Sequence, residues 1–458
     1  MAATVSRDYT VGSISSHLLH FSFPLFLSNL LQACYGAADT IIVGHYVGTA
    51  GTAAVGIGAQ LMIVLTAACT GLCTGGMVTL SQYRGAGDNI GQKKTIGTFF
   101  TMMFIIAIIL TIVGTIASPS FIRSLNTPEE SIEQATNYLR ICCLGILFIF
   151  GYNCICAVFR GLGNSIYPLY FVAVAATLNI ILDLVFLGPL KMKSEGTALA
   201  TVISQGVSFI GAAVFLCMQK DMHFRPGLKA FIPDKEKVIL ILKVGVPSMC
   251  QTLIVQSSLL VVNAMINAYG LAEAAAAAIG NRIFNFFMLP RQAISFAAGN
   301  IVGQNMGAGK PDRAREAIRI GVIYSIIVAA AMFAFINLFP EFTAGIFNSS
   351  PDVIAESVKY IHIVSLSYLF MAPMTVYNNL AVGVGNSKRS MINSITDSVF
   401  VRLPLCFILS KVSGLGLTGI YIGMAVSPIS AVLLGWHYFH YENWQEEHFI
   451  RKTGDKQK

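Results

Sequence analysis

Residues 23–44 read FPLFLSNLLQACYGAADTIIVG, and Asp39 is the only charged residue among them. A helix needs about 20 mostly apolar residues to cross the hydrocarbon core of a bilayer. The alternation of apolar and polar residues that is typical of strands is missing here. The stretch therefore predicts a membrane-spanning helix.

The composition of the whole chain supports the same interpretation. Of its 458 residues, 55% are hydrophobic and 11% are charged, whereas soluble domains carry about 25% charged residues. A soluble protein of this length needs a charged surface, so the composition argues against a soluble enzyme, a disordered protein and a nucleic-acid-binding protein. Most of the ten cysteines lie in apolar runs without the spacing of a zinc site, and we expect buried free thiols.

Twelve stretches of the chain have the length and hydropathy of a spanning helix. They lie near 17–44, 52–80, 95–117, 136–159, 167–188, 196–218, 238–267, 273–301, 316–339, 354–382, 390–410 and 416–440. We therefore expect an all-α polytopic membrane protein with twelve transmembrane helices.

The basic residues predict how these helices are oriented. Lys and Arg concentrate in cytoplasmic loops of membrane proteins. With a cytoplasmic N-terminus, 21 of the 30 basic residues fall on the cytoplasmic side and six on the other. The remaining three, Arg282, Arg291 and Arg402, fall inside predicted helices. We expect both termini in the cytoplasm, and the net charge of +8 then reflects topology rather than an acidic partner.

The chain repeats itself at an offset of 222 residues. Residues 81–88 read SQYRGAGD and residues 303–310 read GQNMGAGK, while RGLGNS at 160–165 matches VGVGNS at 382–387. Ile57-Gly58 and Ile279-Gly280 match at the same offset. Because each half holds six helices, both halves enter the membrane from the same side, which predicts a parallel repeat of two lobes.

The repeat sets the predicted domain organisation. We expect an N-terminal lobe at 1–218, a cytoplasmic linker at 219–237, a C-terminal lobe at 238–440 and a cytoplasmic tail at 441–458. The substrate path is expected between the lobes. GAGK at 307–310 ends a helix, and Pro311 follows it, so it is not a phosphate-binding loop. Without a nucleotide motif, transport must draw on an ion gradient.

Polar residues of the first lobe fall at one predicted depth in the membrane. Asn179 and Asp183 share a helical face at i, i+4 spacing, and Asp39 and Thr201 lie at a similar level. Acids at this depth are costly and are by default functional candidates. Their oxygens suit a proton or a hard cation such as Na⁺, although a polar cluster that only fixes helix packing is the alternative. Three further residues are expected to line the cavity: Gln32, Tyr138 and Asn153.

The second lobe has a different set of polar residues. The position that matches Asp39 is Val261. From its polar residues we expect Gln256, Asn263 and Arg291 to line the substrate cavity. Asp397 and Arg402 share one predicted helix and could pair with neighbours. The sequence does not imply a bond between them, since i, i+5 is a poor spacing on an α-helix. Ion coupling is therefore expected in the first lobe.

Prolines and glycines mark places where helices bend or approach closely. Pro24 and Pro247 take nearly matching places in the two halves. Each removes a backbone hydrogen bond and can bend its helix, so the two prolines either gate the path or shape the bundle. The spacing of Gly419 and Gly423 predicts close helix packing.

In these features the chain resembles the MATE (multidrug and toxic compound extrusion) family, and most closely its DinF-type bacterial branch. FPLFLSNLLQACYGAADTIIVG, LNIILD at 178–183 and the SQYRGAGD/GQNMGAGK pair carry the resemblance. It implies a secondary antiporter that exports cationic, amphipathic compounds in exchange for H⁺ or Na⁺. The family's first-lobe motif maps onto these residues: Pro24, Gln32, Asp39, Tyr138, Asn153, Asn179, Asp183 and Thr201.

The resemblance also implies a location and a set of partners. We expect a monomer in the bacterial cytoplasmic membrane, with no cofactor besides the coupling ion and no nucleic-acid partner. One departure matters, since the NorM-type branch carries an acid on helix 7 where this chain has Val255 and Gln256. Asp39 is then the leading acid.

Two other functions remain open at this point. A flippase for lipid-linked precursors would need a cationic groove, which Arg282, Arg291 and Arg402 could supply. An integral-membrane enzyme such as a prenyltransferase would need paired carboxylates for Mg²⁺, and the sequence has no such motif. The substrate and the choice between H⁺ and Na⁺ are not readable from the sequence.

Overall fold

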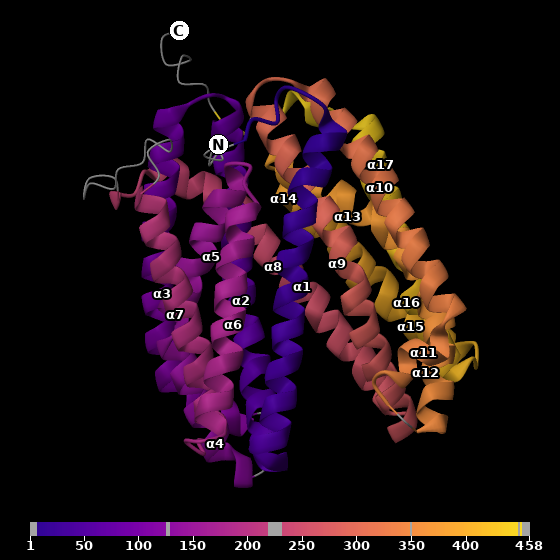
Figure 1. Ribbon diagram of the computed structural model, residues 1–458. Helices are drawn as coiled ribbons and strands as arrows, with labels where there is room; N and C mark the ends of the chain where they lie inside the picture. Colours follow the sequence, from indigo (N-terminus) through magenta and orange to yellow (C-terminus); the bar gives the residue numbers. More distant parts are fainter. Residues whose placement is uncertain (1–6, 125–128, 219–230, 349, 448, 451–458) are drawn as a thin grey trace. The chain divides into compact units, whose positions relative to one another are not determined.

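A computed structural model describes residues 7–124, 129–218, 231–348, 350–447 and 449–450 (Figure 1). Within these ranges the regular structure is entirely helical. The predicted spans correspond to α1 (Ile14–Tyr46), α2 (Gly48–Gly85), α3 (Asn89–Ser124), α4 (Glu129–Leu144) with α5 (Ile146–Gly161), α6 (Ile166–Leu187), α7 (Ser194–Met218), α8 (Lys235–Asn267), α9 (Leu271–Gly307), α10 (Pro311–Leu338), α12 (Pro351–Val364) with α13 (Ser367–Val384), the stretch Ser387–Val412, and α16 (Gly416–Val426) with α17 (Pro428–Tyr441). A short helix, α11 (Pro340–Gly345), precedes α12.

The structure confirms an all-α membrane protein of the expected architecture. Nine described helices are long and apolar enough to cross a membrane, and eleven spans result when each bent pair counts as one. Both bent pairs, α4 with α5 and α12 with α13, change direction by 48°. The twelfth place belongs to α9, which is 37 residues long and carries Glu273, Arg282 and Arg291. Most of the predicted linker (219–230) and the last eight residues of the predicted tail (451–458) lie outside the described residues.

The stretch Ser387–Val412 is an alternation of α and π turns. It consists of α14 (Ser387–Ile395), the π-helix η3 (Thr396–Arg402), α15 (Leu403–Phe407) and the π-helix η4 (Ile408–Val412). It packs closely on α16, since a Cβ added at Gly423 would lie 2.8 Å from the backbone nitrogen of Cys406. The predicted close packing at the Gly419 and Gly423 spacing is therefore confirmed.

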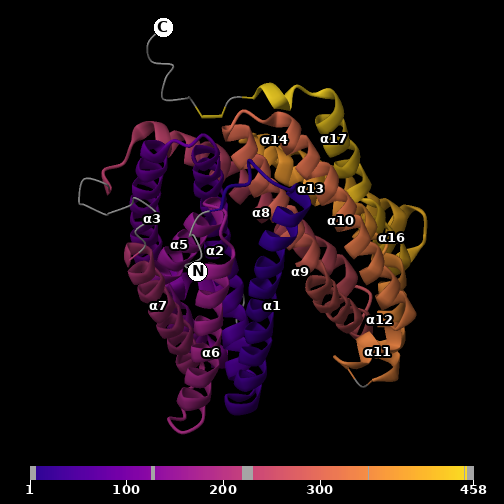
Figure 2. The ribbon, with the colours of Figure 1, turned by 45° about the horizontal axis from the view of Figure 1, so that its top comes forward.

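The chain divides into two compact units. The first comprises residues 1–8 and 27–245, and the second comprises residues 9–26 and 246–458. In the first unit, α5 packs against α2, α3 and α7, which lie around it in Figure 2. The boundaries fall inside two helices, because α1 passes from the second unit to the first after Phe26 and α8 passes back after Gly245.

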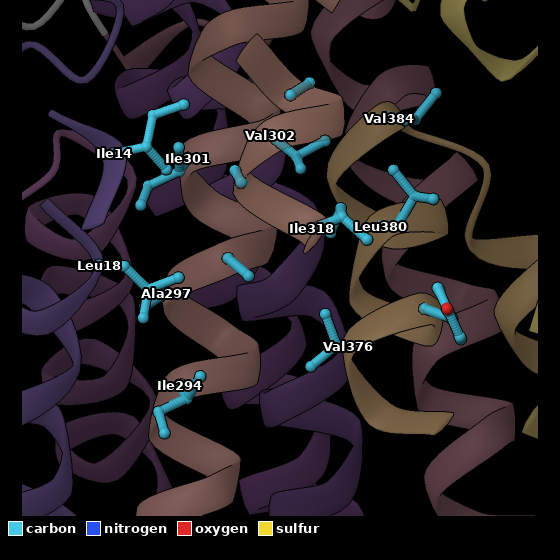
Figure 3. Packing of buried hydrophobic residues seen from close by; sticks show 14 of the residues in the cluster. Ile14, Leu18, Ile294, Ala297, Ile301, Val302, Ile318, Val376, Leu380 and Val384 are labelled. Carbon is cyan, nitrogen blue, oxygen red and sulfur yellow. The ribbon is translucent and has the colours of Figure 1, made fainter. Parts of the chain in front are cut away.

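The core of the second unit includes the beginning of α1. Ile14 and Leu18 pack with Ile294, Ala297 and Ile301 of α9 (Figure 3). Residues of α10, α13 and α17 complete this cluster. Residues far apart in the sequence thus share one apolar core, which includes the start of α1 in the second unit.

The predicted duplication is confirmed residue by residue. A Cβ added at Gly58 would overlap the ring of Tyr138, and one added at Gly280 would overlap the ring of Tyr360, so both partners obey the offset of 222. The GAG turns also match, since Gly87 and Gly309 have φ of 69° and 70°, a left-handed conformation that favours glycine. The two units are therefore repeats of one helical plan.

Candidate ion site in the first unit

Two acids of the first unit lie together on neighbouring helices. Asp183 on α6 is fully buried, and Asp39 on α1 is partly buried. Their carboxyl groups lie within electrostatic range of each other. The fold thus brings near each other two acids that the sequence placed at one depth.

The predicted polar neighbours surround this acid pair. Asn179, one helical turn before Asp183, is buried, and its amide nitrogen donates to the hydroxyl of Thr201 on α7 at 3.4 Å. Tyr138 of α4 is buried within electrostatic range of Asp39. Tyr35 also lies within range of both acids. The sequence analysis missed Tyr35, although its i, i+4 spacing to Asp39 places it on the same helical face.

Several oxygen atoms of this cluster lack a hydrogen-bond partner. They are both carboxylate oxygens of Asp183, Oδ1 of Asp39 and Oδ1 of Asn179. Buried polar groups are nearly always hydrogen-bonded, so these oxygens are available to accept a hydrogen bond or to coordinate a cation. No basic side chain forms an ion pair with either acid among the residues that the structure describes.

The chemistry of these atoms fits a small hard cation or a proton. Carboxylate, amide and hydroxyl oxygens are the ligands that such cations prefer. A single proton held between the two carboxyl groups would also give each a partner, as in pairs of acids that share a site. No group of three or more His, Cys, Asp and Glu side chains is placed to hold a metal ion in the described part of the chain. A softer transition-metal site is therefore not formed there.

Gln32 and Asn153, the other predicted residues of the first unit, form no hydrogen bond with the acid pair or its neighbours among the described residues. The side chain of Gln32 is exposed on α1. Asn153 on α5 is partly buried, and its amide nitrogen donates to the backbone carbonyl of Ile149 at 2.8 Å. That bond satisfies one donor within its own helix, so Asn153 keeps its carbonyl oxygen available.

The predicted cavity residues of the second unit have different surroundings. Gln256 is exposed on α8. Asn263 accepts from the amide of Asn281 at 3.3 Å, and Asn281 accepts from the hydroxyl of Tyr360 at 3.0 Å. Asn263 therefore belongs to a hydrogen-bonded chain that links α8, α9 and α12.

Arg291 is buried and is held by neutral groups. Its Nη1 donates to the carbonyl of Met371 and to the hydroxyl of Thr375, both at 2.6 Å, and its Nη2 contacts the sulfur of Met288. The side chain is 4% exposed. A buried guanidinium without a carboxylate partner keeps its charge uncompensated, and this charge is fixed in the core of the second unit.

Asp397 and Arg402 pair with each other, a bond that their spacing did not imply. Arg402 Nη2 donates to Asp397 Oδ2 at 2.5 Å, and both side chains are buried. The reason is the π-helix η3, which covers both residues. A π-helix places residues i and i+5 in adjacent turns, whereas an α-helix turns them apart.

The two prolines lie next to the boundaries between the units. Pro24 lies inside α1, close to the change of unit after Phe26, and Pro247 lies inside α8, close to the change after Gly245. Both helices continue through their prolines. The weakest points of the two shared helices therefore coincide with the unit boundaries, while their role in bending stays a prediction.

Comparison with known proteins agrees with this architecture. The chain is 28% identical to the probable multidrug resistance protein YpnP of Bacillus subtilis, over 96% of this chain and 97% of that protein. It is 27% identical to the probable multidrug resistance protein NorM of Thermotoga maritima, over 98% and 97%. A solved transporter of the MOP superfamily from Pyrococcus furiosus matches with a TM-score of 0.89 and 24% identity, over 94% of this chain and 96% of that one.

A family profile also matches the chain, and it does so twice. The MatE profile covers residues 24–185 and residues 247–408. One match lies in each half of the duplication, and together they cover more than half of the chain. The chain therefore belongs to the MatE family.

Proposed function

We propose that this protein is a secondary active exporter of cationic, amphipathic small molecules, driven by exchange for H⁺ or Na⁺ through alternating access. The observation that carries the proposal is the buried pair of Asp39 and Asp183, which face each other without a basic partner. An acid pair that serves only structure would be expected to have its oxygens satisfied.

The acid pair supplies the difference between two states. With a proton or a Na⁺ bound, the oxygens of Asp39, Asp183, Asn179 and Thr201 gain a partner. Without the ion, two negative charges share a poorly hydrated place, which is unfavourable. Ion entry and exit can therefore change the relative stability of two arrangements of α1, α6 and α7, as coupled transport requires.

Other residues have supporting roles in this proposal. Gln32, Tyr138 and Asn153 in the first unit, and separately Gln256 and Asn263 in the second, are proposed to contact the transported molecule. Arg291 is held in the core by Met371 and Thr375 and is not among them. Pro24 and Pro247 absorb the change of direction in the two helices shared by both units. The protein is a multi-pass membrane protein, and we infer from its basic loops that both termini are cytoplasmic.

The geometry favours an exporter over a flippase for lipid-linked precursors. A flippase would use free arginines to bind pyrophosphate. Arg402 pairs with Asp397, and Arg291 is bound to Met371 and Thr375. Arg282 keeps an exposed side chain. The names of the two bacterial relatives also point to drug export.

The test is dye export from proteoliposomes under an imposed pH gradient and, separately, an imposed Na⁺ gradient. We expect Asp39→Asn and Asp183→Asn to lower gradient-driven export by at least about tenfold. Glu356→Gln is the matched control, because it removes an acid of the second unit that pairs with Lys359 at the surface. If Asp39→Asn exports the dye as fast as the unaltered protein, the coupling mechanism is wrong.

A further inference from the structure

The first unit has an apolar cavity that does not include the residues of the acid pair. It has a volume of 440 Å³ and is lined almost wholly by apolar atoms. Phe100, Phe104 and Ala107 of α3 form one wall, Phe209 of α7 forms the opposite wall, and Leu147 and Gly151 of α5 form the floor. Small-molecule sites have volumes of about 300–1,000 Å³.

The groove exists because of how three helices pack. Both α3 and α7 pack on α5, but they make little contact with each other. The ring of Phe209 lies directly against Gly151, where a Cβ would overlap it, so the missing side chain at Gly151 lets this wall rest on α5. The groove is therefore a space between two walls over α5.

The groove opens on an apolar outer face of the first unit. Phe104 is 53% exposed, and the neighbouring faces carry exposed Ile108 on α3 and Ile210 on α7. In a protein that spans a membrane, such faces contact acyl chains. An apolar chain from the bilayer is therefore the molecule that meets the opening.

One end of the groove is closed by the segment 231–235, which is fixed on α3. Thr101 donates its hydroxyl to the carbonyl of Phe231 at 2.7 Å, the backbone N–H of Asp234 donates to Thr98 Oγ1 at 2.9 Å, and Lys94 pairs with Asp234 at 3.1 Å. Phe231 also lines the groove. The apolar cavity thus ends at the segment 231–235, whose backbone is hydrogen-bonded to α3.

Several lysines lie close to the segment 231–235 in the sequence or on α3. Lys93, Lys94 and Lys235 have exposed side chains, and Lys93 and Lys235 form no ion pair among the described residues. Lys94 lies about 10 Å along the helix from Thr101, at 1.5 Å per residue. Basic residues at a membrane surface attract anionic lipid head groups. The charges therefore lie where a phosphate would be if an acyl chain entered the groove.

We propose that this groove is a binding site for an anionic phospholipid, with one acyl chain between α3 and α7 and the phosphate beside Lys93, Lys94 and Lys235. The site is separate from the acid pair and does not depend on the proposed transport function. Its ligand comes from the leaflet next to the segment 231–235.

The test is native mass spectrometry of the delipidated full chain titrated with dioleoyl-phosphatidylglycerol or dioleoyl-phosphatidylcholine. We expect one phosphatidylglycerol to bind about fivefold or more tightly than phosphatidylcholine, the effect of about one net surface lysine. Gly151→Leu displaces the ring of Phe209, a wall of the groove, and should abolish this preference. Gly211→Leu is the matched control, because it adds the same group to α7 at a position with open space around it.

Two further variants keep the test decisive if Gly151→Leu does not fold. Phe231→Ala opens the end of the groove and should weaken phosphatidylglycerol binding severalfold. Lys93→Ala combined with Lys235→Ala should remove the preference for the anionic lipid while leaving phosphatidylcholine binding unchanged. Equal binding of both lipids by the unaltered protein overturns the proposal. So does one-for-one displacement of phosphatidylglycerol by tetraphenylphosphonium, which would make the groove a place for cationic cargo.

Discussion

The first unit places Asp39 and Asp183 face to face without a base, whereas the second unit pairs its buried Asp397 with Arg402. Both units derive from one helical plan, as the matching contacts of Gly58 with Tyr138 and of Gly280 with Tyr360 show. One copy therefore leaves its acids without a basic partner among the described residues, while the other pairs its acid with an arginine. The same scaffold supports an unpaired acid site and a paired one.

The largest effect on stability is expected from breaking the fixed pair. Arg402→Leu leaves a buried, unpaired carboxylate and should lower the free energy of unfolding by about 3–5 kcal/mol. Thermal unfolding in detergent measures this loss. Arg402→Leu combined with Asp397→Leu should recover most of it, because both charges are then removed. A single variant as stable as the unaltered protein would show that the pair does not hold η3.

The duplicated glycines test whether the two copies are equivalent. Gly58→Ala and Gly280→Ala each force a Cβ into a tyrosine ring and should each cost about 1–3 kcal/mol through overpacking. Gly36→Ala is the control, because a Cβ there meets nothing within 4 Å, and it should stabilise α1 by up to about 1 kcal/mol. If thermal unfolding shows that Gly58→Ala and Gly280→Ala lower stability by clearly different amounts, the two copies are not equivalent.

The open acid pair should respond in the opposite direction from the fixed pair. Asp183→Asn replaces a partnerless carboxylate by an amide that can donate to Asp39, so stability should rise by about 1 kcal/mol while coupled export is lost. The measurement is thermal unfolding and transport on the same preparation. A clear loss of stability would mean that Asp183 is held by interactions of the kind seen in the second unit.

The smallest effect is expected from an ion pair at the surface of the first unit. Burial raises the pKa of Asp234, but hydrogen bonds from Lys94 and from the backbone of Lys237 outweigh burial, so the net pKa lies below 3.8. A lowered folded-state pKa gives stability that is present above the unfolded value and is lost as the pH falls through the folded value. Because the pair is largely exposed, Asp234→Asn should cost less than about 1 kcal/mol at pH 7.

That variant should also remove the pH dependence contributed by Asp234, which lies below pH 3.8. Unfolding measured from pH 7 down to pH 3 on both proteins checks this. The two curves should stay a constant distance apart between pH 5 and pH 7 and converge below pH 3.8. If the difference between them changes mainly between pH 5 and pH 7 instead, another group is responsible.

Hydropathy and the repeat made the helices and the two halves predictable, because both depend on the sequence pattern alone. The acid pair was predictable too, since acids are rare in spanning helices and Asn179 and Asp183 share a face. The pairing of Asp397 with Arg402 was not, because it depends on the π turns of η3. Nothing in the sequence of 396–402 signals a π turn in place of an α turn.

The division of α1 between the units has a consequence for how the protein is made. Tyr9–Phe26 emerges first, but its partners Ile294, Ala297 and Ile301 are synthesised only after the whole first unit. At the usual 5–20 residues per second, the delay is on the order of tens of seconds. During synthesis, the apolar face with Ile14 and Leu18 therefore lacks its native partners until α9 has been made. If translation slows or the chain is truncated, this segment is where non-native contacts would form.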